Sequence, residues 1–107
     1  INILDSRTVA TNCVQGSYEL SKKALGLVTF SLAKMLAPKI RVNAIAPGAI
    51  LPPVDKPEFD MSSRISKMPL GKAPTPVDIA DACVFLAKND KITGQIIYVD
   101  SGEHLNG

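Results

Sequence analysis

The sequence has no tryptophan, one histidine and two cysteines among its 107 residues. With a single histidine, a histidine-based metal site is not expected. Cys13 and Cys83 are too few and too far apart for a disulfide framework, and their apolar neighbours predict buried free thiols. No apolar run approaches the roughly 18 residues of a membrane span. We therefore expect no metal, no membrane partner and a cytoplasmic protein.

An excess of charge of one sign is also missing. Twelve Lys and Arg stand against ten Asp and Glu, and the net charge of +2 is scattered along the chain. A nucleic-acid-binding protein would normally show a basic stripe, so no nucleic-acid partner is expected. Apolar residues make up 46% and charged residues 21%, which is ordinary for a globular domain and excludes disorder of the whole chain. The length allows one domain at most.

The hydrophobic pattern predicts strands that alternate with helices. Short apolar runs rich in β-branched residues predict strands at Ile1–Leu4, Ile40–Ala46 and Gly94–Val99. Apolar residues at helical spacing predict helices at Tyr18–Ala37 and Pro76–Lys88. This alternation indicates a parallel α/β sheet, but three strands and two long helices make only half of a doubly wound fold. Because the chain begins within a predicted strand and without methionine, we expect residues 1–107 to be one partial domain.

Local signals refine this organisation. The first long helix is apolar nearly all round, which predicts burial on two sides. Thr75 and Asp78 form a capping-box pattern at the start of the second. The segment Ala49–Pro74 holds five prolines and little periodicity, which predicts a functional or mobile loop with one helical turn at Arg64–Lys67.

Tyr18 and Lys22 are the first candidates for chemistry. They are four residues apart on a predicted helix, which places both side chains on one face. Free tyrosine has a pKa near 10, and a positive charge within a few Å lowers it by stabilising phenolate. The pair could therefore transfer protons, although a surface aromatic beside a solvated lysine would give the same spacing.

Three segments in order resemble one known family. They are Tyr-Glu-Leu-Ser-Lys (18–22), Ile-Arg-Val-Asn-Ala-Ile-Ala-Pro-Gly (40–48) and Thr-Gly-Gln-Ile-Ile-Tyr-Val-Asp-Ser-Gly (93–102). Together they resemble the C-terminal half of short-chain dehydrogenases/reductases, whose fold is Rossmann-like. The Gly-rich turn with which that family holds the cofactor diphosphate is absent here.

The resemblance implies specific roles. Tyr18 would be the general acid/base, and Lys22 would lower its pKa and bind the nicotinamide ribose. Pro47 and Gly48 would form the turn beneath the nicotinamide, and the backbone of Ile50 would bind its carboxamide. The loop at residues 49–74 would contact the substrate.

Three further polar sites are given no catalytic role. Asn43 matches a strand position whose role we take to be structural. Asp100–Gly102 matches the end of the family's last strand, where turn chemistry alone explains the residues at least as well. His104 has no partner in the sequence and is expected at the surface.

One position departs from the usual pattern. A serine normally lies thirteen residues before the tyrosine, but here Asp5 does, with Ser6 beside it. A register slip of one residue would explain this. Alternatively, an aspartate there is similar to pteridine reductases and related dihydrofolate reductases of the family. A carboxylate would oppose formation of the Tyr18 phenolate, but it could accept from ring N–H and amino groups and relay a proton to a ring nitrogen.

The resemblance implies an NAD(P)H-dependent oxidoreductase acting on a small molecule, with NADP expected and NAD possible. A pterin- or dihydrofolate-like ring is the preferred substrate, and a 3-oxoacyl or other carbonyl compound is the alternative. A truncated, non-catalytic remnant that only self-associates is an alternative of another class. The family commonly pairs subunits through its two long helices, which implies a homo-oligomer, and the chain alone is expected to be inactive.

Overall fold

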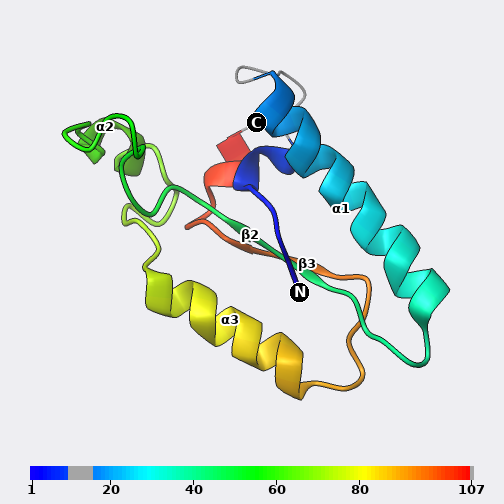
Figure 1. Ribbon diagram of the computed structural model, residues 1–107. Coiled ribbons are helices and arrows are strands. Elements are labelled where there is room, and N and C mark those ends of the chain that lie inside the picture. The colour runs from blue at the N-terminus through cyan, green and yellow to red at the C-terminus, as the bar shows by residue number, and fades with distance from the viewer. Residues whose placement is uncertain (10–15, 107) are drawn as a thin grey trace.

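Strands and helices alternate along the chain, as the sequence predicts (Figure 1). The computed structural model describes residues 1–9 and 16–106. The strands are β1 (Asn2–Ile3), β2 (Ala44–Pro47) and β3 (Ile96–Val99), and the α-helices are α1 (Ser17–Leu36), α2 (Ser62–Ile65) and α3 (Pro76–Lys88). Two short 3₁₀ helices, η1 (Ser6–Val9) and η2 (Glu103–Asn106), follow β1 and β3.

The three strands form one parallel sheet in the order β1-β2-β3. The central strand is fully buried at Ala44, Ile45 and Ala46, and the two alanines cluster with Leu4. Because side chains alternate along a strand, Ile45 faces the opposite side. Helices α1 and α3 lie on opposite faces of the sheet (Figure 1). This arrangement confirms the predicted parallel α/β fold of the Rossmann type.

Helix α1 approaches the sheet closely on one side only. An added Cβ at Gly26 would lie 3.7 Å from Leu4 Cδ1 and 4.0 Å from Ile96 Cδ1. On the outer side, Leu27 and Met35 are 71% and 75% exposed. Within this single chain the sheet covers only one side of the helix, and its outer side, predicted to be buried against another helix, is exposed. Among the described residues, no helix has both the length and the apolar character needed to cross a membrane.

Helix α3 begins and ends where the sequence predicts. The Thr75 hydroxyl accepts the N–H of Asp78, and the Asp78 carboxylate accepts the N–H of Thr75 at 2.7 Å. At the other end, the guanidinium of Arg41 donates to the carbonyls of Leu86 and Ala87 at 2.8 and 3.0 Å. These bonds satisfy backbone groups that a helix leaves unpaired at its ends.

The predicted strand at residues 40–46 is shorter in the structure. Asn43 is buried, its amide donates to the carbonyl of Ile92, and its Oδ1 accepts the N–H of Gln95, both at 2.9 Å. These side-chain bonds connect Asn43 to the turn before β3. The regular pairing of β2 with β3 therefore starts only at Ala44. The bonding supports the structural role expected of Asn43. The third strand likewise starts at Ile96, two residues later than predicted.

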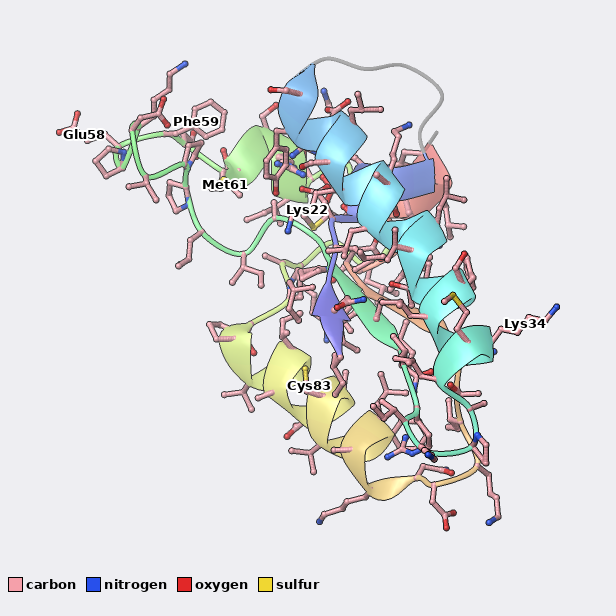
Figure 2. All side chains as sticks on the ribbon, turned by 45° about the vertical axis from the view of Figure 1, so that its right-hand side comes forward. Lys22, Lys34, Glu58, Phe59, Met61 and Cys83 are labelled. Carbon is pink, nitrogen blue, oxygen red and sulfur yellow. The ribbon has the colours of Figure 1, made fainter. Side chains whose placement is uncertain are left out.

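The long loop after β2 projects from the sheet, and its outer part carries Glu58 and Phe59 (Figure 2). Its single helical turn, α2, lies two residues before the predicted Arg64–Lys67. The shift has a local cause, because the Asp60 carboxylate accepts the N–H and the hydroxyl of Ser62 and so fixes the start of the turn.

The predicted burial of the two cysteines can be compared with the structure only at Cys83. Cys83 is a free thiol on α3 that is only half-buried, so the prediction of full burial is wrong for it. Cys13 lies outside the described residues. Within residues 1–9 and 16–106, no group of three or more His, Cys, Asp or Glu could hold a metal ion.

Candidate active site

The carboxyl end of β1 meets the first turn of α1. Asp5 lies two residues after the end of β1, and the hydroxyl of Tyr18 donates to Asp5 Oδ2 at 3.2 Å. Ser6, by contrast, is 1% exposed and donates to Glu103 instead. The fold therefore places Asp5, and not Ser6, against the tyrosine.

Arg7 is a member of this cluster that the sequence analysis missed. Its Nε and Nη2 donate to the two oxygens of Asp5 at 3.0 and 2.9 Å, and its backbone N–H donates to Oδ1 at 2.9 Å. Its Nη1 reaches Glu19 at 3.4 Å, and its Cζ lies 5.7 Å from the centre of the Tyr18 ring. The Asp-x-Arg spacing in a tight turn was the signal that could have revealed the pair, since an aspartate often bonds the N–H two residues on.

These surroundings shift the pKa values of Asp5 and Tyr18 in opposite directions. Burial of the Asp5 carboxyl opposes ionisation, but hydrogen bonds and charge from Arg7 outweigh it and lower the pKa of Asp5. Burial, followed by the charge and hydrogen bond of Asp5, raises the pKa of Tyr18, and Arg7 opposes this only in part. Around neutral pH the cluster therefore holds an ionised acceptor beside a protonated phenol.

Lys22 lies on the same side of α1 as Tyr18, as the four-residue spacing predicts. Its Nζ is 5.9 Å from the centre of the Tyr18 ring and donates to the carbonyl of Ile3 at 2.9 Å. Burial and the hydrogen-bonded carboxylate of Asp5 raise the pKa of Tyr18, whereas the resemblance implies that Lys22 lowers it. The ammonium of Lys22 instead bonds the end of β1.

Pro47, Gly48 and Ile50 lie at the carboxyl end of β2, beside the end of β1. In parallel sheets, ligands bind outside this edge of the strands. Gly48 donates its N–H to the carbonyl of Val99 at 3.0 Å. Ile50 is half-buried, and in the described part of the chain its backbone takes part in no hydrogen bond, which leaves its N–H and carbonyl free to bind a ligand.

Gly48 allows the carboxyl ends of β2 and β3 to approach each other closely. A Cβ added there would lie 2.8 Å from both Cα and Cβ of Asp100. At Gly26 an added Cβ would make only ordinary contacts, the nearest at 3.7 Å.

We therefore expect Gly48→Ala to lower the free energy of unfolding by about 1–3 kcal/mol, as overpacking usually does. The matched variant Gly26→Ala should be neutral or stabilising by about 0.5–1 kcal/mol, because alanine suits a helix interior better than glycine. Urea unfolding of the two variants in a full-length protein carrying this chain measures both. An equal effect of the two substitutions would contradict the assigned contact.

His104 is not a surface residue without partners, as the sequence suggested. Its Nδ1 lies 2.8 Å from Asp100 Oδ2, and its ring stacks on Tyr98 with centroids 4.1 Å apart. Asp100, 2% exposed, also accepts the N–H groups of Gly102 and His104. The fold creates this partner because η2 turns back over the end of β3. The bonding of Asp100 agrees with turn chemistry for residues 100–102.

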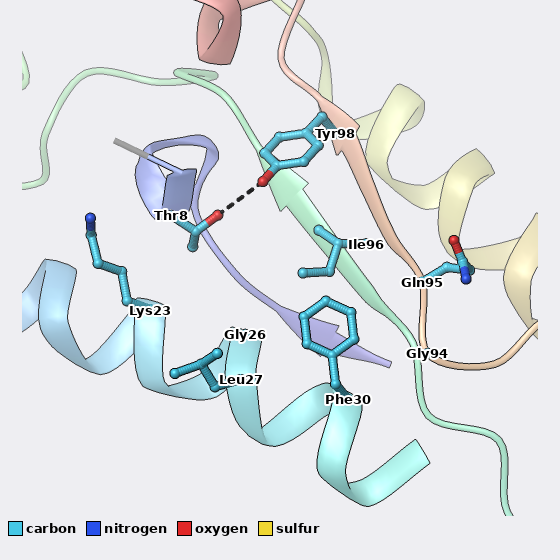
Figure 3. A pocket seen from close by; sticks show the side chains of 9 residues that line it. All are labelled: Thr8, Lys23, Gly26, Leu27, Phe30, Gly94, Gln95, Ile96 and Tyr98. Atoms are coloured by element: carbon cyan, nitrogen blue, oxygen red, sulfur yellow. Dashed lines mark hydrogen bonds between the residues drawn. The ribbon is translucent and has the colours of Figure 1, made fainter. Parts of the chain in front are cut away.

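A hollow of about 550 Å³ lies between α1 and β3 (Figure 3). Its lining is mainly apolar and includes Leu27, Phe30 and Ile96. At its end, the hydroxyls of Thr8 and Tyr98 share a hydrogen bond of 3.3 Å. It includes none of the predicted site residues, so this hollow and the candidate active site are separate features.

Comparisons with known proteins identify the family of this chain. Residues 1–104 match the family model described as enoyl-(acyl carrier protein) reductase. The 3-oxoacyl-[acyl-carrier-protein] reductase of Thermotoga maritima is 36% identical over 107 residues, covering 95% of this chain and 44% of the relative. A short-chain dehydrogenase/reductase homolog of Bacillus subtilis, YusR, is 40% identical over 89 residues, covering 82% of this chain and 69% of YusR.

Among solved structures, alternative dihydrofolate reductase 1 (FolM) of Brucella suis, in complex with NADP, superposes with a TM-score of 0.86. The identity is 44%, over 97% of this chain and 40% of that one. The chain thus spans less than half the length of the Thermotoga and Brucella relatives. The match over almost all of its residues shows that this chain belongs to the short-chain dehydrogenase/reductase family.

Proposed function

We propose that this chain is the catalytic half of an NAD(P)H-dependent reductase that acts on a pterin- or dihydrofolate-like ring. The observation that carries the proposal is the hydrogen bond from Tyr18 to Asp5, which puts a proton donor and a carboxylate acceptor side by side. The 44% identity to the Brucella dihydrofolate reductase supports the same substrate class. The loop at residues 49–74 would close over the ring.

The residues present fit the nicotinamide end of the cofactor. Lys22 offers an ammonium at the edge of the sheet where ligands bind, and Ile50 offers backbone groups without partners in the described chain. Lys22 would hold the ribose, and Ile50 would hold the carboxamide. The cofactor would supply the hydride. The NADP named with the Brucella structure makes NADP the preferred form.

Tyr18 would donate the proton that completes the reduction. Its raised pKa keeps the phenol protonated at neutral pH, which suits a general acid. Asp5, held ionised by Arg7, would accept from ring N–H and amino groups of the substrate and so orient it. The lowered pKa of Asp5 favours this acceptor role over the proton relay that the sequence also allowed.

Reduction of a 3-oxoacyl or other carbonyl compound is the second candidate. The 36% identity to the Thermotoga 3-oxoacyl reductase favours it, and a protonated Tyr18 could serve a carbonyl oxygen equally well. A carbonyl oxygen, however, offers no N–H for the fixed carboxylate of Asp5. The comparisons give no support to a remnant that only self-associates.

Steady-state NADPH oxidation by the full-length protein tests the proposal. Dihydrobiopterin and dihydrofolate should be turned over with kcat/KM at least about tenfold above that for an acetoacetyl thioester, because an N–H bond to a charged acceptor contributes about 1.5–3 kcal/mol. A clear preference for the thioester would contradict the ring substrate. Absence of NADPH oxidation with all three would contradict the reductase itself.

The isolated chain should associate and should bind the cofactor weakly or not at all. Its two long helices expose large apolar side chains, among them Leu20 and Met35 on α1 and Phe85 on α3. Such a surface exceeds what a soluble monomer usually tolerates, so we expect a homodimer or larger oligomer built on these helices. Sedimentation and a fluorescence titration with NADPH measure both properties. A compact monomer, or micromolar cofactor affinity, would contradict this expectation.

A further inference from the structure

Glu103, the first residue of η2, joins three segments that are distant in sequence. Its Oε2 accepts the hydroxyl of Ser6 at 3.3 Å and the N–H of Ala49 at 3.4 Å. Its Oε1 accepts Nε of Arg64. The donors are 97, 54 and 39 residues from Glu103 in the sequence. The carboxylate is thus a single acceptor for the turn after β1, the start of the long loop and the helical turn inside that loop.

Each of these segments carries part of the proposed site. Ser6 follows Asp5 directly, and Ala49 precedes Ile50. Arg64 lies in α2, within the loop proposed to close over the substrate. Within the described part of the chain, the Glu103 carboxylate bonds neither Tyr18 nor Lys22, so any effect on the reaction must pass through these neighbours.

The surroundings of Glu103 favour a carboxylate at this position and restrict its movement. The Glu103 side chain is 17% exposed, and that of Arg64 is 37% exposed. A Cβ added at Gly48 would lie 3.1 Å from Oε2, so this oxygen has little room to move. A glutamine could offer one acceptor oxygen only, and its amide would face a donor on the other side.

We infer that Glu103 is a positioning residue, which fixes Asp5, Ile50 and the substrate loop relative to one another. The inference rests on the proposed function in naming what is positioned. The structural link itself rests only on the contacts of the carboxylate.

Kinetics of the full-length protein separate two parts of this role. Arg64→Met removes only the loop contact, so KM for the dihydropterin should rise about tenfold while kcat stays within about twofold. Glu103→Gln also loosens the turn beside Asp5 and the start of the loop, so it should raise KM and lower kcat, each by about tenfold, since small misplacements at a reacting centre are costly. In the double variant, KM should equal that of Glu103→Gln alone.

Asp90→Asn is the matched control. Asp90 pairs with Lys91 at 3.5 Å, but both side chains are at least 80% exposed and lie far along the chain from the site residues. This control should leave kcat and KM within about twofold of the wild type. Changes in kcat and KM that are as large in the control as in Glu103→Gln would contradict a specific role of Glu103.

Amide hydrogen exchange tests the link without any assay of activity. In Glu103→Gln, exchange at Ala49 and in α2 should be at least about tenfold faster, while α3 should keep wild-type rates. Arg64→Met, whose side chain is partly exposed, should show the α2 effect even if Glu103→Gln folds poorly. Unchanged exchange in α2 of Arg64→Met would overturn the inference. Changed exchange in a protein that reduces none of the substrates would overturn the proposed function and leave the link intact.

Discussion

Tyr18→Phe in the full-length protein is expected to lower kcat by at least about 10²-fold, the usual scale for loss of a general acid. Phenylalanine keeps the ring but has no proton to donate. KM for the substrate should change by less than about threefold, because the ring still fills its place on α1. Steady-state NADPH oxidation with dihydrobiopterin measures both constants.

The chain offers a matched control in its other tyrosine. Tyr98 shares its hydroxyl with Thr8 in the hollow between α1 and β3, and it is not among the predicted site residues. Tyr98→Phe should therefore keep kcat within about twofold of the wild type. Near-full turnover by Tyr18→Phe would show that another group supplies the proton.

Asp5→Ser is expected to separate the two substrate classes. Removing the carboxylate leaves ring N–H groups without a charged acceptor, and such a bond is worth about 1.5–3 kcal/mol, or roughly 10- to 100-fold in kcat/KM. For a carbonyl substrate, kcat/KM should fall much less, because serine can donate to its oxygen. The ratio of kcat/KM for dihydrobiopterin to that for a simple ketone measures the effect.

The exposed Asp90→Ser controls for the loss of a negative charge, and it should leave the substrate ratio unchanged. Stability should be followed in parallel, since Asp5→Ser also leaves Arg7 without the carboxylate that it binds at two points. Equal losses on both substrates in Asp5→Ser would remove the reason for preferring a pterin-like ring.

Local sequence signals predicted the features that neighbouring residues determine. Helix α3 begins as expected, because Thr75 and Asp78 form its cap within four residues. The parallel α/β class follows from alternating short apolar runs and amphipathic segments. The common face of Tyr18 and Lys22 follows from helical spacing alone, and the structure shows both near the end of β1.

Features that depend on distant segments escaped the sequence analysis. The start of β2 was placed too early because Asn43 bonds a turn about fifty residues away. Glu103 was missed because its three partners are 39 to 97 residues from it. Lys22 was expected to lower the pKa of Tyr18, but burial and the hydrogen bond to Asp5 raise it. No spacing rule along the sequence predicts these contacts.

We expect a hydride to pass from the nicotinamide to the substrate ring while Tyr18 supplies the proton. Incubation of the full-length protein with NADPH deuterated at the transferred position, followed by mass spectrometry of the product, tests this most directly. The tetrahydropterin formed from dihydrobiopterin should carry one deuterium, and Tyr18→Phe should reduce its rate of formation by at least about 10²-fold. A product without deuterium, or unchanged formation by Tyr18→Phe, would contradict the account.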